Sequence, residues 1–294
     1  MTSEDNIKYF LLLKRANKMK KTILLIFTLA TTTLAIAQSK QEVSVYLGAG
    51  LSSLKYDIDQ SGETSSKFGP LFGIGYTYKL NPEWGIVSGL EMAIYKTDAT
   101  SDALKGQYTT QDNYGNDFEW RQTFHNFEED QKGTYLNIPI MVQYTPASLN
   151  KFYANLGFKI GIPLSGKYDA SYTKLVTSGY YPETDAEYTD IDFRGFGEFG
   201  GSSSKEDIDL KVAFILSAEC GMKWNLSNSM NLYTGGYVDY GLNNIIKGNK
   251  DNEIIPYDQD NPTNLKYNGL VNSNLIDKVV PFAFGLKVRL GFSL

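Results

Sequence analysis

The C-terminal stretch VVPFAFGLKVRLGFSL (residues 279–294) alternates between two kinds of side chain up to its last residue. Every second residue from Phe282 to Leu294 is apolar, whereas the positions between them are small or cationic, among them Lys287 and Arg289. A period of two is the signature of a β-strand, because successive side chains point to opposite faces. The apolar face fits two environments, the core of a soluble sandwich or the lipid around a membrane barrel.

Seven further segments show the same alternation and are typical of strands. They cover Val43–Ser53, Phe68–Leu80, Glu83–Lys96, Gly133–Thr145, Lys151–Tyr168, Ile208–Trp224 and Met230–Leu242. Segments of about eleven residues or more exceed the usual soluble strand of about five or six residues and suit a tilted membrane crossing.

The connections between these segments favour the barrel over the sandwich. Short turns containing NP, PASLN and NLSNS join the second segment to the third, the fourth to the fifth and the sixth to the seventh. The other connections are long and polar, and the last three run to roughly thirty-five or forty residues. Outer-membrane barrels show this asymmetry. The sequence therefore predicts an all-β fold, an eight-stranded up-and-down antiparallel transmembrane β-barrel with short periplasmic turns and long extracellular loops.

Aromatic residues mark the short-turn end of the predicted barrel. Five of them lie in phase on the apolar face: Tyr78, Trp84, Tyr144, Phe152 and Trp224. We interpret them as a periplasmic aromatic girdle, because amphipathic rings favour the membrane interface. The alternative is the general tendency of strands to end in aromatic residues.

Six charged residues fall near mid-height on the predicted lumen face. They are Glu91, Lys159, Glu219, Asp239, Lys287 and Arg289. Three acids and three bases meet there, and buried charges persist only when they are paired and hydrogen-bonded. We therefore expect a salt-bridge network that blocks water and ions.

The N-terminal region predicts export. Residues 19–38, MKKTILLIFTLATTTLAIAQ, combine a positive start, a short apolar core and a small-x-small cleavage site that ends at Ala37. This is the pattern of a secretory signal peptide over residues 19–37; its apolar run is too short for the alternative, a membrane anchor. Residues 1–18 are interpreted as a start assigned too early, or as a long positive region. The barrel domain is expected over residues 38–294.

Composition narrows the partners and the chemistry. The formal net charge of −5 argues against nucleic acid as a partner. Cys220 is the single cysteine, so an intramolecular disulfide is excluded, and its place in the alternation puts it on the lipid face. Beyond the signal peptide, the chain has no apolar run long enough for a membrane helix.

Catalytic and metal-binding patterns are weak. His125 lies in a predicted loop and could act as the general base of a hydrolase, oriented by Glu128 or Asp130. No serine or cysteine nucleophile lies in a recognisable turn, so a solvated loop histidine is favoured. The acidic runs FEED (127–130), DNE (251–253) and DQD (258–260) lack calcium-loop spacing, so solvated loop surface is favoured. The stretch GFGEFGGSSSKED (195–207) is interpreted as a flexible tip, since it lacks the ending of a phosphate loop. We predict no catalytic, cofactor-binding or metal-binding residues.

With its strands placed, the chain resembles the eight-stranded outer-membrane β-barrel proteins of Bacteroidetes, the PorT-like or porin family. The stretches that carry the resemblance are YLNIPIMVQY (135–144), KFYANLGFKIGIPLSGKY (151–168), MNLYTGGYVDYGLNNI (230–245) and PFAFGLKVRLGFSL (281–294). The resemblance implies a Gram-negative outer-membrane location and insertion by the barrel-assembly machinery. That machinery reads a terminal strand that usually ends in phenylalanine; here Phe292 precedes the final Leu294.

The expected function is non-enzymatic. We predict a protein that sits in outer-membrane lipid and has a structural or surface-interaction role, meeting an extracellular or secretion-system partner through its loops. The alternative is a narrow porin-like channel or a component of a PorT-like secretion or transport assembly.

Overall fold

The computed structural model describes residues 40–58, 62–148, 151–247 and 253–294. These residues form ten strands and two short 3-10 helices. The strands are β1 (Gln41–Lys55), β2 (Gly62–Lys79), β3 (Trp84–Gln111), β4 (Asp117–Tyr144), β5 (Phe152–Tyr181), β6 (Ala186–Tyr188), β7 (Gly197–Asp207), β8 (Ala213–Asn225), β9 (Met230–Gly241) and β10 (Val280–Ser293), and the helices are η2 (Asp192–Arg194) and η3 (Leu270–Asn272). The predicted upstream extension and signal peptide, residues 1–37, lie outside the described residues.

Eight of the strands close into a ring. Going around it, β1, β2, β3, β4, β5, β8, β9 and β10 are each hydrogen-bonded to the next, always antiparallel, and β10 returns to β1. The closing pair runs from Glu42 opposite Ser293 to Lys55 opposite Val280. Closure satisfies the backbone groups that an open sheet would leave at its edges. The predicted eight-stranded antiparallel barrel is confirmed.

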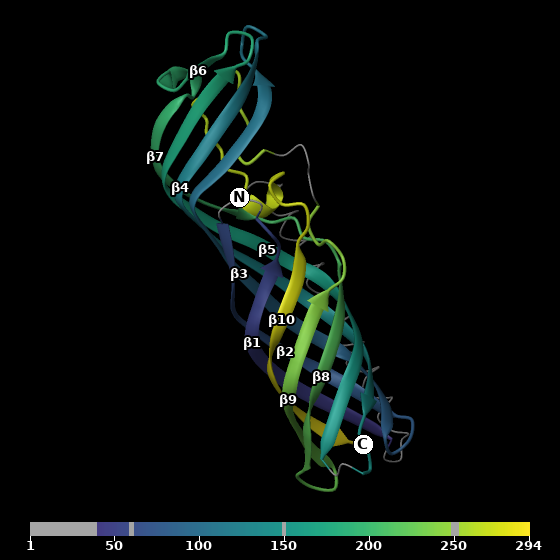
Figure 1. Ribbon diagram of the computed structural model, residues 1–294. Helices are drawn as coiled ribbons and strands as arrows, with labels where there is room; N and C mark the ends of the chain where they lie inside the picture. Colours follow the sequence, from purple (N-terminus) through teal and green to yellow (C-terminus); the bar gives the residue numbers. More distant parts are fainter. Residues whose placement is uncertain (1–39, 59–61, 149–150, 248–252) are drawn as a thin grey trace, which may run out of the picture.

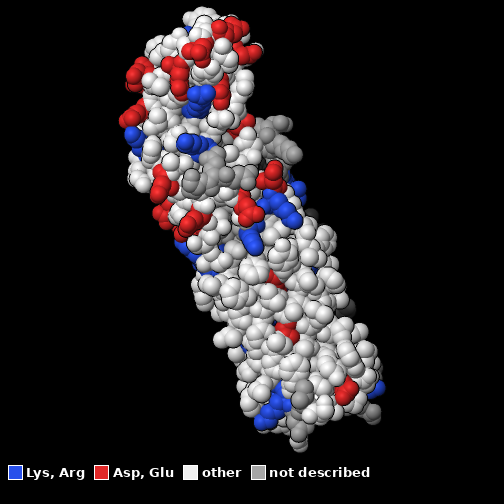
Figure 2. Space-filling model, viewed as in Figure 1, with Lys and Arg blue, Asp and Glu red and all other residues white. Residues whose placement is uncertain are grey.

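The part of the ring nearer the short turns, which is the lower part in Figure 1, carries an apolar band on its outer surface. Large apolar side chains point outward on every strand, as with Leu47 (69% exposed) and Leu286 (73% exposed). Figure 2 shows this part of the molecule as an almost uncharged surface on the face in view. The part of the chain that the structure describes contains no helix of the length and apolar character needed to cross a bilayer.

Glycines on the inner surface make room for tyrosine rings. A Cβ added at Gly73 would meet the Tyr46 ring at 2.6 Å, and one added at Gly235 would meet the Tyr153 hydroxyl at 2.8 Å. Both tyrosines are buried. These tyrosine rings thus point into the lumen, and the interior of an eight-stranded barrel is just wide enough for side chains.

Three strands continue far beyond the apolar band as an extracellular extension (Figure 1). β3 continues from Ile94, the last apolar outward residue, to Gln111, a strand length of about 55 Å. β4 and β5 rise beside it, and β6 and β7 pair with β5. The predicted long loop between the third and fourth strands is therefore wrong. So is the predicted flexible tip at 195–207, most of which is β7.

A local break in the alternation hid these strands. Asn126 on β4 has a positive φ of 49°, and the ladder passes from Ser101 opposite Phe127 directly to Ala103 opposite His125. The register is the same on both sides of this point, but the buried face changes parity on both strands: Phe124 and Phe127 of β4 are both buried although their spacing is odd, as are Ala99 and Leu104 of β3. This change of parity makes the sequence resemble a loop.

Residues 253–279, which precede β10, fold back over the concave face of the extension and contribute to its hydrophobic core (yellow in Figure 1). Ile255, Tyr267 and Leu270 from this segment are buried in a cluster with Leu104 and Phe124 of the extended strands. In a second cluster the ring of Trp120 lies 4.2 Å from that of Tyr257, centroid to centroid. Residues 253–279 therefore form a packed layer over the extension, which we call the cover.

Glu129 anchors this cover. The carboxylate is fully buried, and it accepts hydrogen bonds from the Tyr267 hydroxyl and from the backbone N–H of Leu270. Burial raises the pKa of Glu129, and these hydrogen bonds offset only part of that effect.

The cover should loosen as the pH rises. Because the pKa of Glu129 is raised in the folded state, its contribution to stability is fully present below the ordinary value of about 4.5 and is lost as the pH rises through the higher folded value. We expect hydrogen-exchange protection of residues 253–279, corrected for intrinsic rates, to fall over this range and then level off. Glu129→Gln, which stays neutral, should remove the fall. An equal fall in both proteins would assign the pH dependence to other groups.

Candidate functional site: the lumen charges and the extracellular tip

Lys159 forms the centre of the lumen. Its Nζ lies 2.7 Å from Oε1 of Glu91 and 2.8 Å from Oδ2 of Asp239, and all three side chains are at most 2% exposed. Asn137 donates a further hydrogen bond to Glu91, and Ser217 donates one to Asp239. The ammonium group therefore links three strands, β3, β5 and β9, through the middle of the barrel.

Lys287 extends the network to a third carboxylate, that of Glu219. Its Nζ lies 3.0 Å from Oε2 of Glu219 and 3.8 Å from Oε2 of Glu91, and it stands 4.0 Å from the centroid of the Tyr46 ring. Tyr153 also donates a hydrogen bond to Glu219. Five of the six predicted lumen charges thus form one connected group of ion pairs.

Arg289 departs from the expectation that three acids meet three bases. Its Nη2 donates to Oε1 of Gln143 at 3.1 Å, and its guanidinium lies 4.0 Å from the centroid of the Tyr233 ring, with no ion pair to a described carboxylate. Arg289 lies two residues further along β10 than Lys287, on the same face, and is therefore closer to the short turns. Glu42, which the sequence analysis missed, is buried at this lower level and accepts hydrogen bonds from Tyr233 and Asn231.

The five predicted girdle residues lie on the outer face at the short-turn end. They are Tyr78, Trp84, Tyr144, Phe152 and Trp224. The rings of Trp84 and Tyr144, opposite each other on β3 and β4, have centroids 4.5 Å apart. Lys151 places its ammonium 4.6 Å from the Trp224 ring. The turn before β3 is closed by the Asn81 side chain, which accepts from the backbone N–H of Trp84.

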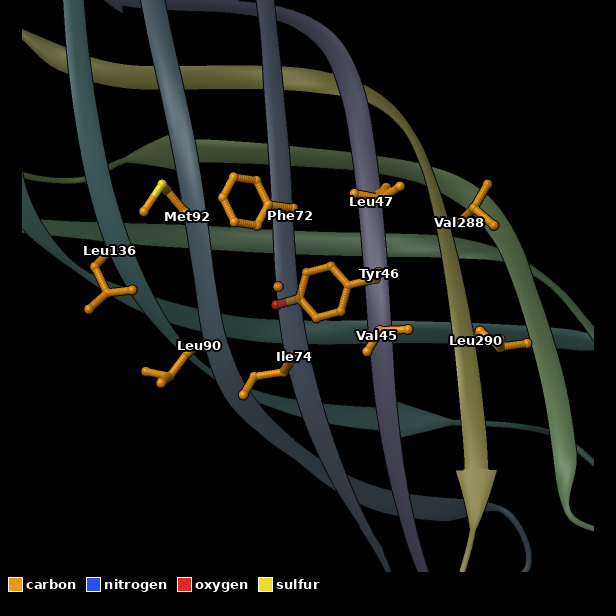
Figure 3. Close-up of a pocket in the computed structure, with 11 residues that line it drawn as sticks. Val45, Tyr46, Leu47, Phe72, Ile74, Leu90, Met92, Leu136, Val288 and Leu290 are labelled. Carbon is orange, nitrogen blue, oxygen red and sulfur yellow. The ribbon is translucent and has the colours of Figure 1, made fainter. Parts of the chain in front are cut away.

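A shallow hollow of about 590 Å³ lies within the apolar band (Figure 3). Val45, Leu47, Phe72 and Ile74 of β1 and β2 line it, and Tyr46 closes its floor between the two strands. Its lining is continuous with the apolar outer surface. The hollow is therefore part of that surface.

The extracellular tip holds a pocket of different character, with a volume of about 530 Å³. We define the tip pocket by Asp112, Tyr114, Asn116, Asp117, Tyr181, Glu183, Thr184, Tyr188, Ile191, Phe193, Arg194 and Phe196. These residues come from the β3–β4 hairpin and from the end of β5 through η2 to β7. The pairing of β4 with β5, with Glu119 opposite Tyr180, brings the two segments together.

Asp112 organises the pocket. Its carboxylate accepts hydrogen bonds from the backbone N–H of Tyr114 and Asn116 and from the Tyr181 hydroxyl, and lies 3.4 Å from Nη1 of Arg194. Burial opposes ionisation of Asp112, but these hydrogen bonds outweigh it and lower its pKa. The carboxylate therefore stays ionised and holds Arg194, whose guanidinium lies 5.3 Å from the Tyr114 ring.

The rest of the pocket is open, aromatic and acidic. Tyr114 is 78% exposed and Phe193 is 76% exposed. The two segments that form the tip, residues 112–121 and 181–196, contain eight acidic residues and two arginines. Apolar patches with a polar rim mark interaction sites, and tyrosine and arginine are enriched among the residues that dominate binding.

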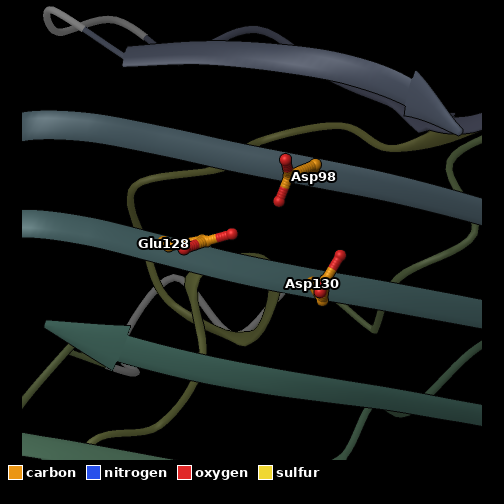
Figure 4. A group of neighbouring side chains, drawn as sticks. All are labelled: Asp98, Glu128 and Asp130. Carbon is orange, nitrogen blue, oxygen red and sulfur yellow. The ribbon is translucent and has the colours of Figure 1, made fainter.

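His125 lies at the bend of the extension, on the outer face of β4 rather than in a loop as predicted. Within the described residues no hydrogen bond joins its imidazole to Glu128 or Asp130. Glu128 and Asp130 point to the same side as Asp98 of β3 (Figure 4), and the three carboxylates approach within 4.8 Å of one another. The ammonium of Lys67 lies 2.7 Å from Asp130 and 3.3 Å from Asp98, so a cation of this chain already occupies the group.

Cys220 is exposed on the apolar outer face of β8, opposite Ala154 and Gly236. This is the face that its place in the alternation predicts. Its surroundings are those of a small apolar side chain.

Comparison with solved structures returns outer-membrane barrels at low identity. Neisserial surface protein A shares 12% identity, with 87% of this chain and 98% of that chain covered and a TM-score of 0.35. Ail, the attachment invasion locus protein of Yersinia pestis, shares 11% identity, with 86% of this chain and 99% of that chain covered and a TM-score of 0.31. OprG from Pseudomonas aeruginosa shares 11% identity, with 87% of this chain and 97% of that chain covered and a TM-score of 0.35. No curated protein matches the chain.

The outer membrane protein beta-barrel domain family matches residues 36–247, which is more than half of the chain. The match covers β1 to β9, and the ring that β10 closes is the barrel that such a domain forms. The outer membrane is accordingly where this protein is located. The chain belongs to the outer membrane protein beta-barrel domain family.

Proposed function

We propose that this protein is a non-enzymatic surface-interaction protein of the outer membrane, in which the barrel serves as an anchor and the extension presents the tip pocket to the outside. The observation that carries the proposal is the pocket itself, with exposed Tyr114 and Phe193 beside ionised Asp112 and Arg194. A packed extension holds this pocket at a fixed place far from the bilayer. Rigid presentation lowers the entropic cost of binding a partner.

The chemistry of the tip favours a basic partner. Its excess of carboxylates attracts cations, and its exposed rings accept guanidinium groups by stacking. We therefore expect the ligand to be a polypeptide segment or protein surface rich in arginine. Such a partner is either extracellular or part of a secretion assembly.

We further propose that the lumen is closed and that the protein does not conduct. The support is the buried network around Lys159, together with the buried tyrosine rings of the lumen, such as Tyr46, Tyr153 and Tyr233. The alternative is a narrow channel or a PorT-like component of a secretion or transport assembly. Planar-bilayer recordings separate the two, since steady single-channel conductance of the wild-type protein would replace the closed lumen with the channel.

A hydrolase function is not proposed. His125 lies at the bend, on a different part of β4 from the tip pocket, and its imidazole has no hydrogen bond to the predicted orienting carboxylates in the residues described. The remaining partners in the proposal are outer-membrane lipid around the band and the barrel-assembly machinery during insertion, which the terminal strand β10 would engage.

The tip is tested with the full-length mature protein in phosphatidylcholine nanodiscs and a labelled oligo-arginine peptide as the probe. Wild-type protein should bind the peptide, and affinity should fall as salt rises. The double substitution Tyr188→Ser with Phe193→Ser should weaken binding about tenfold, because it removes two stacking faces. Leu226→Ser, which changes an exposed residue of the periplasmic turn, should leave the affinity for the peptide unchanged. Equal binding by the tip variant and the wild type would refute the proposal.

A further inference from the structure

Lysines occupy the outward face of neighbouring strands at one height, just above the apolar band. Lys96 on β3 lies opposite Lys132 on β4, and Lys132 lies opposite Lys167 on β5. We call these three residues the lysine row. Like charges directly opposite each other on neighbouring strands destabilise a sheet. A row of three therefore calls for a counter-charge.

The nearest carboxylates are already used by other lysines. On one side of the row Lys67 pairs with Asp98 and Asp130, and on the other Lys205 pairs with Asp169 at 2.6 Å.

The ammonium groups of the row itself remain without an ion pair in the described part of the chain. No carboxylate oxygen of a described residue lies within 4.0 Å of Lys96, Lys132 or Lys167. Asp207 stands opposite Lys167 in the ladder to β7 and forms no ion pair with it at that distance. The row thus forms no ion pair with the carboxylates around it, which are Asp98, Asp130 and Asp169 one step above and Asp207 beside it.

The height of the row identifies what lies beside it. One step below, on the same face, are Ile94, Thr134 and Ser165, and the apolar band continues beneath them with Met92 and Leu136. A step of two residues is about 7 Å of strand. The polar headgroup layer extends about 5–8 Å beyond the hydrocarbon of each leaflet. The lysine row therefore stands at headgroup depth on the extracellular side.

The surface at the row is also hollowed. The same three lysines, with Lys67 and Lys205, line a hollow of about 560 Å³ together with Tyr168 and the neighbouring carboxylates. Figure 2 shows that charged side chains begin at the upper edge of the uncharged band on the face in view. A ligand here meets five lysines, two of them paired with carboxylates, and has the apolar band below it.

We propose that the lysine row binds the phosphate of a phosphorylated lipid in the outer leaflet, whose acyl chains lie on the apolar band beneath. Ammonium groups are effective phosphate partners, and basic hollows beside a membrane surface bind anionic headgroups. The lipid supplies the missing counter-charge and relieves the repulsion along the row. This site is separate from the tip pocket, so it stands whether or not the tip binds a basic partner.

The test uses the full-length mature protein in phosphatidylcholine nanodiscs that contain a small fraction of diphosphorylated lipid A, with retained lipid measured by native mass spectrometry. Wild-type protein should retain the phosphorylated lipid. The variant Lys96→Gln/Lys132→Gln/Lys167→Gln should lose about 100-fold in affinity. The control Lys174→Gln/Lys247→Gln/Lys266→Gln removes the same charge from exposed lysines that pair with carboxylates, and should keep wild-type affinity.

A second measurement guards against a folding defect. In pure phosphatidylcholine the row variant should unfold at or above the wild-type temperature, because it removes repulsion, and lipid A should raise the unfolding temperature of the wild type only. Undiminished retention by the row variant, or an equal loss in the control, would overturn the proposal. Displacement of the lipid by millimolar inorganic phosphate would assign the row to free phosphate instead.

Discussion

Lys159→Met should lower the free energy of unfolding of the barrel by about 3–5 kcal/mol. The substitution keeps an unbranched side chain that is only one atom shorter, but it leaves Glu91 and Asp239 as buried carboxylates without their shared ammonium. Removing one partner of a buried ion pair leaves an uncompensated charge, which is more costly than losing the attraction itself. Urea unfolding in lipid vesicles, followed by gel mobility and tryptophan fluorescence, measures the change.

Two further variants locate the cause of this loss. Lys174→Met removes an exposed ion pair with Glu198 on β7 and should change stability by about 1 kcal/mol or less. Glu91→Gln/Lys159→Met/Asp239→Asn makes these three residues neutral and should regain much of the lost stability, since Lys287 keeps its ion pair with Glu219 and no charge is left unpaired. If Lys159→Met were as mild as Lys174→Met, the lumen would not be the dry, charge-paired interior that the burial implies.

Trp120→Ala should open the extension and leave the barrel intact. Trp120 is fully buried, and its ring packs against Tyr257 of the cover. Truncating a buried tryptophan to alanine costs about 3–5 kcal/mol, through the lost burial and the cavity that remains. We expect hydrogen exchange in residues 253–279 to accelerate by about 100-fold or more in nanodiscs. The amide protons of the ring strands below the extension should exchange as in the wild type.

Tyr114→Ala is the matched control for this substitution. Tyr114 stands in the same extension but is 78% exposed, so its truncation should leave exchange in the cover close to wild type. Unchanged exchange in the Trp120→Ala protein would mean that the cover is held by other contacts. Faster exchange throughout the ring would mean that barrel and extension unfold as one unit.

The period of two, and the strict alternation of short and long connections, were enough to predict the ring of eight. Both follow from local chemistry, because the side-chain period of a strand and the residues of a tight turn are readable in one dimension. The same alternation placed Glu91, Lys159 and Lys287 on the lumen face. It also placed Cys220 and the five aromatic residues on the outer face.

The alternation did not determine which lumen charges meet. Lys287 and Arg289 share one face of β10, two residues apart, yet only Lys287 reaches carboxylates. The stagger between neighbouring strands decides which rungs face each other across a closed barrel, and that stagger comes from the pairing of all eight strands. A count of residues from the short-turn end cannot supply it.

The extension and the tip pocket were decided by tertiary structure. At Asn126 the buried face of β4 changes parity, so the alternation on either side is out of phase and the sequence resembles a loop. The side chains of the extended strands that are buried are those on which residues 253–279 pack, and this packing exists only in the folded protein. Asp112 and Arg194 are far apart in the chain and meet because β4 pairs with β5 along its full length. A sequence therefore determines the faces of its strands, whereas contacts between distant strands depend on registers that only the folded sheet fixes.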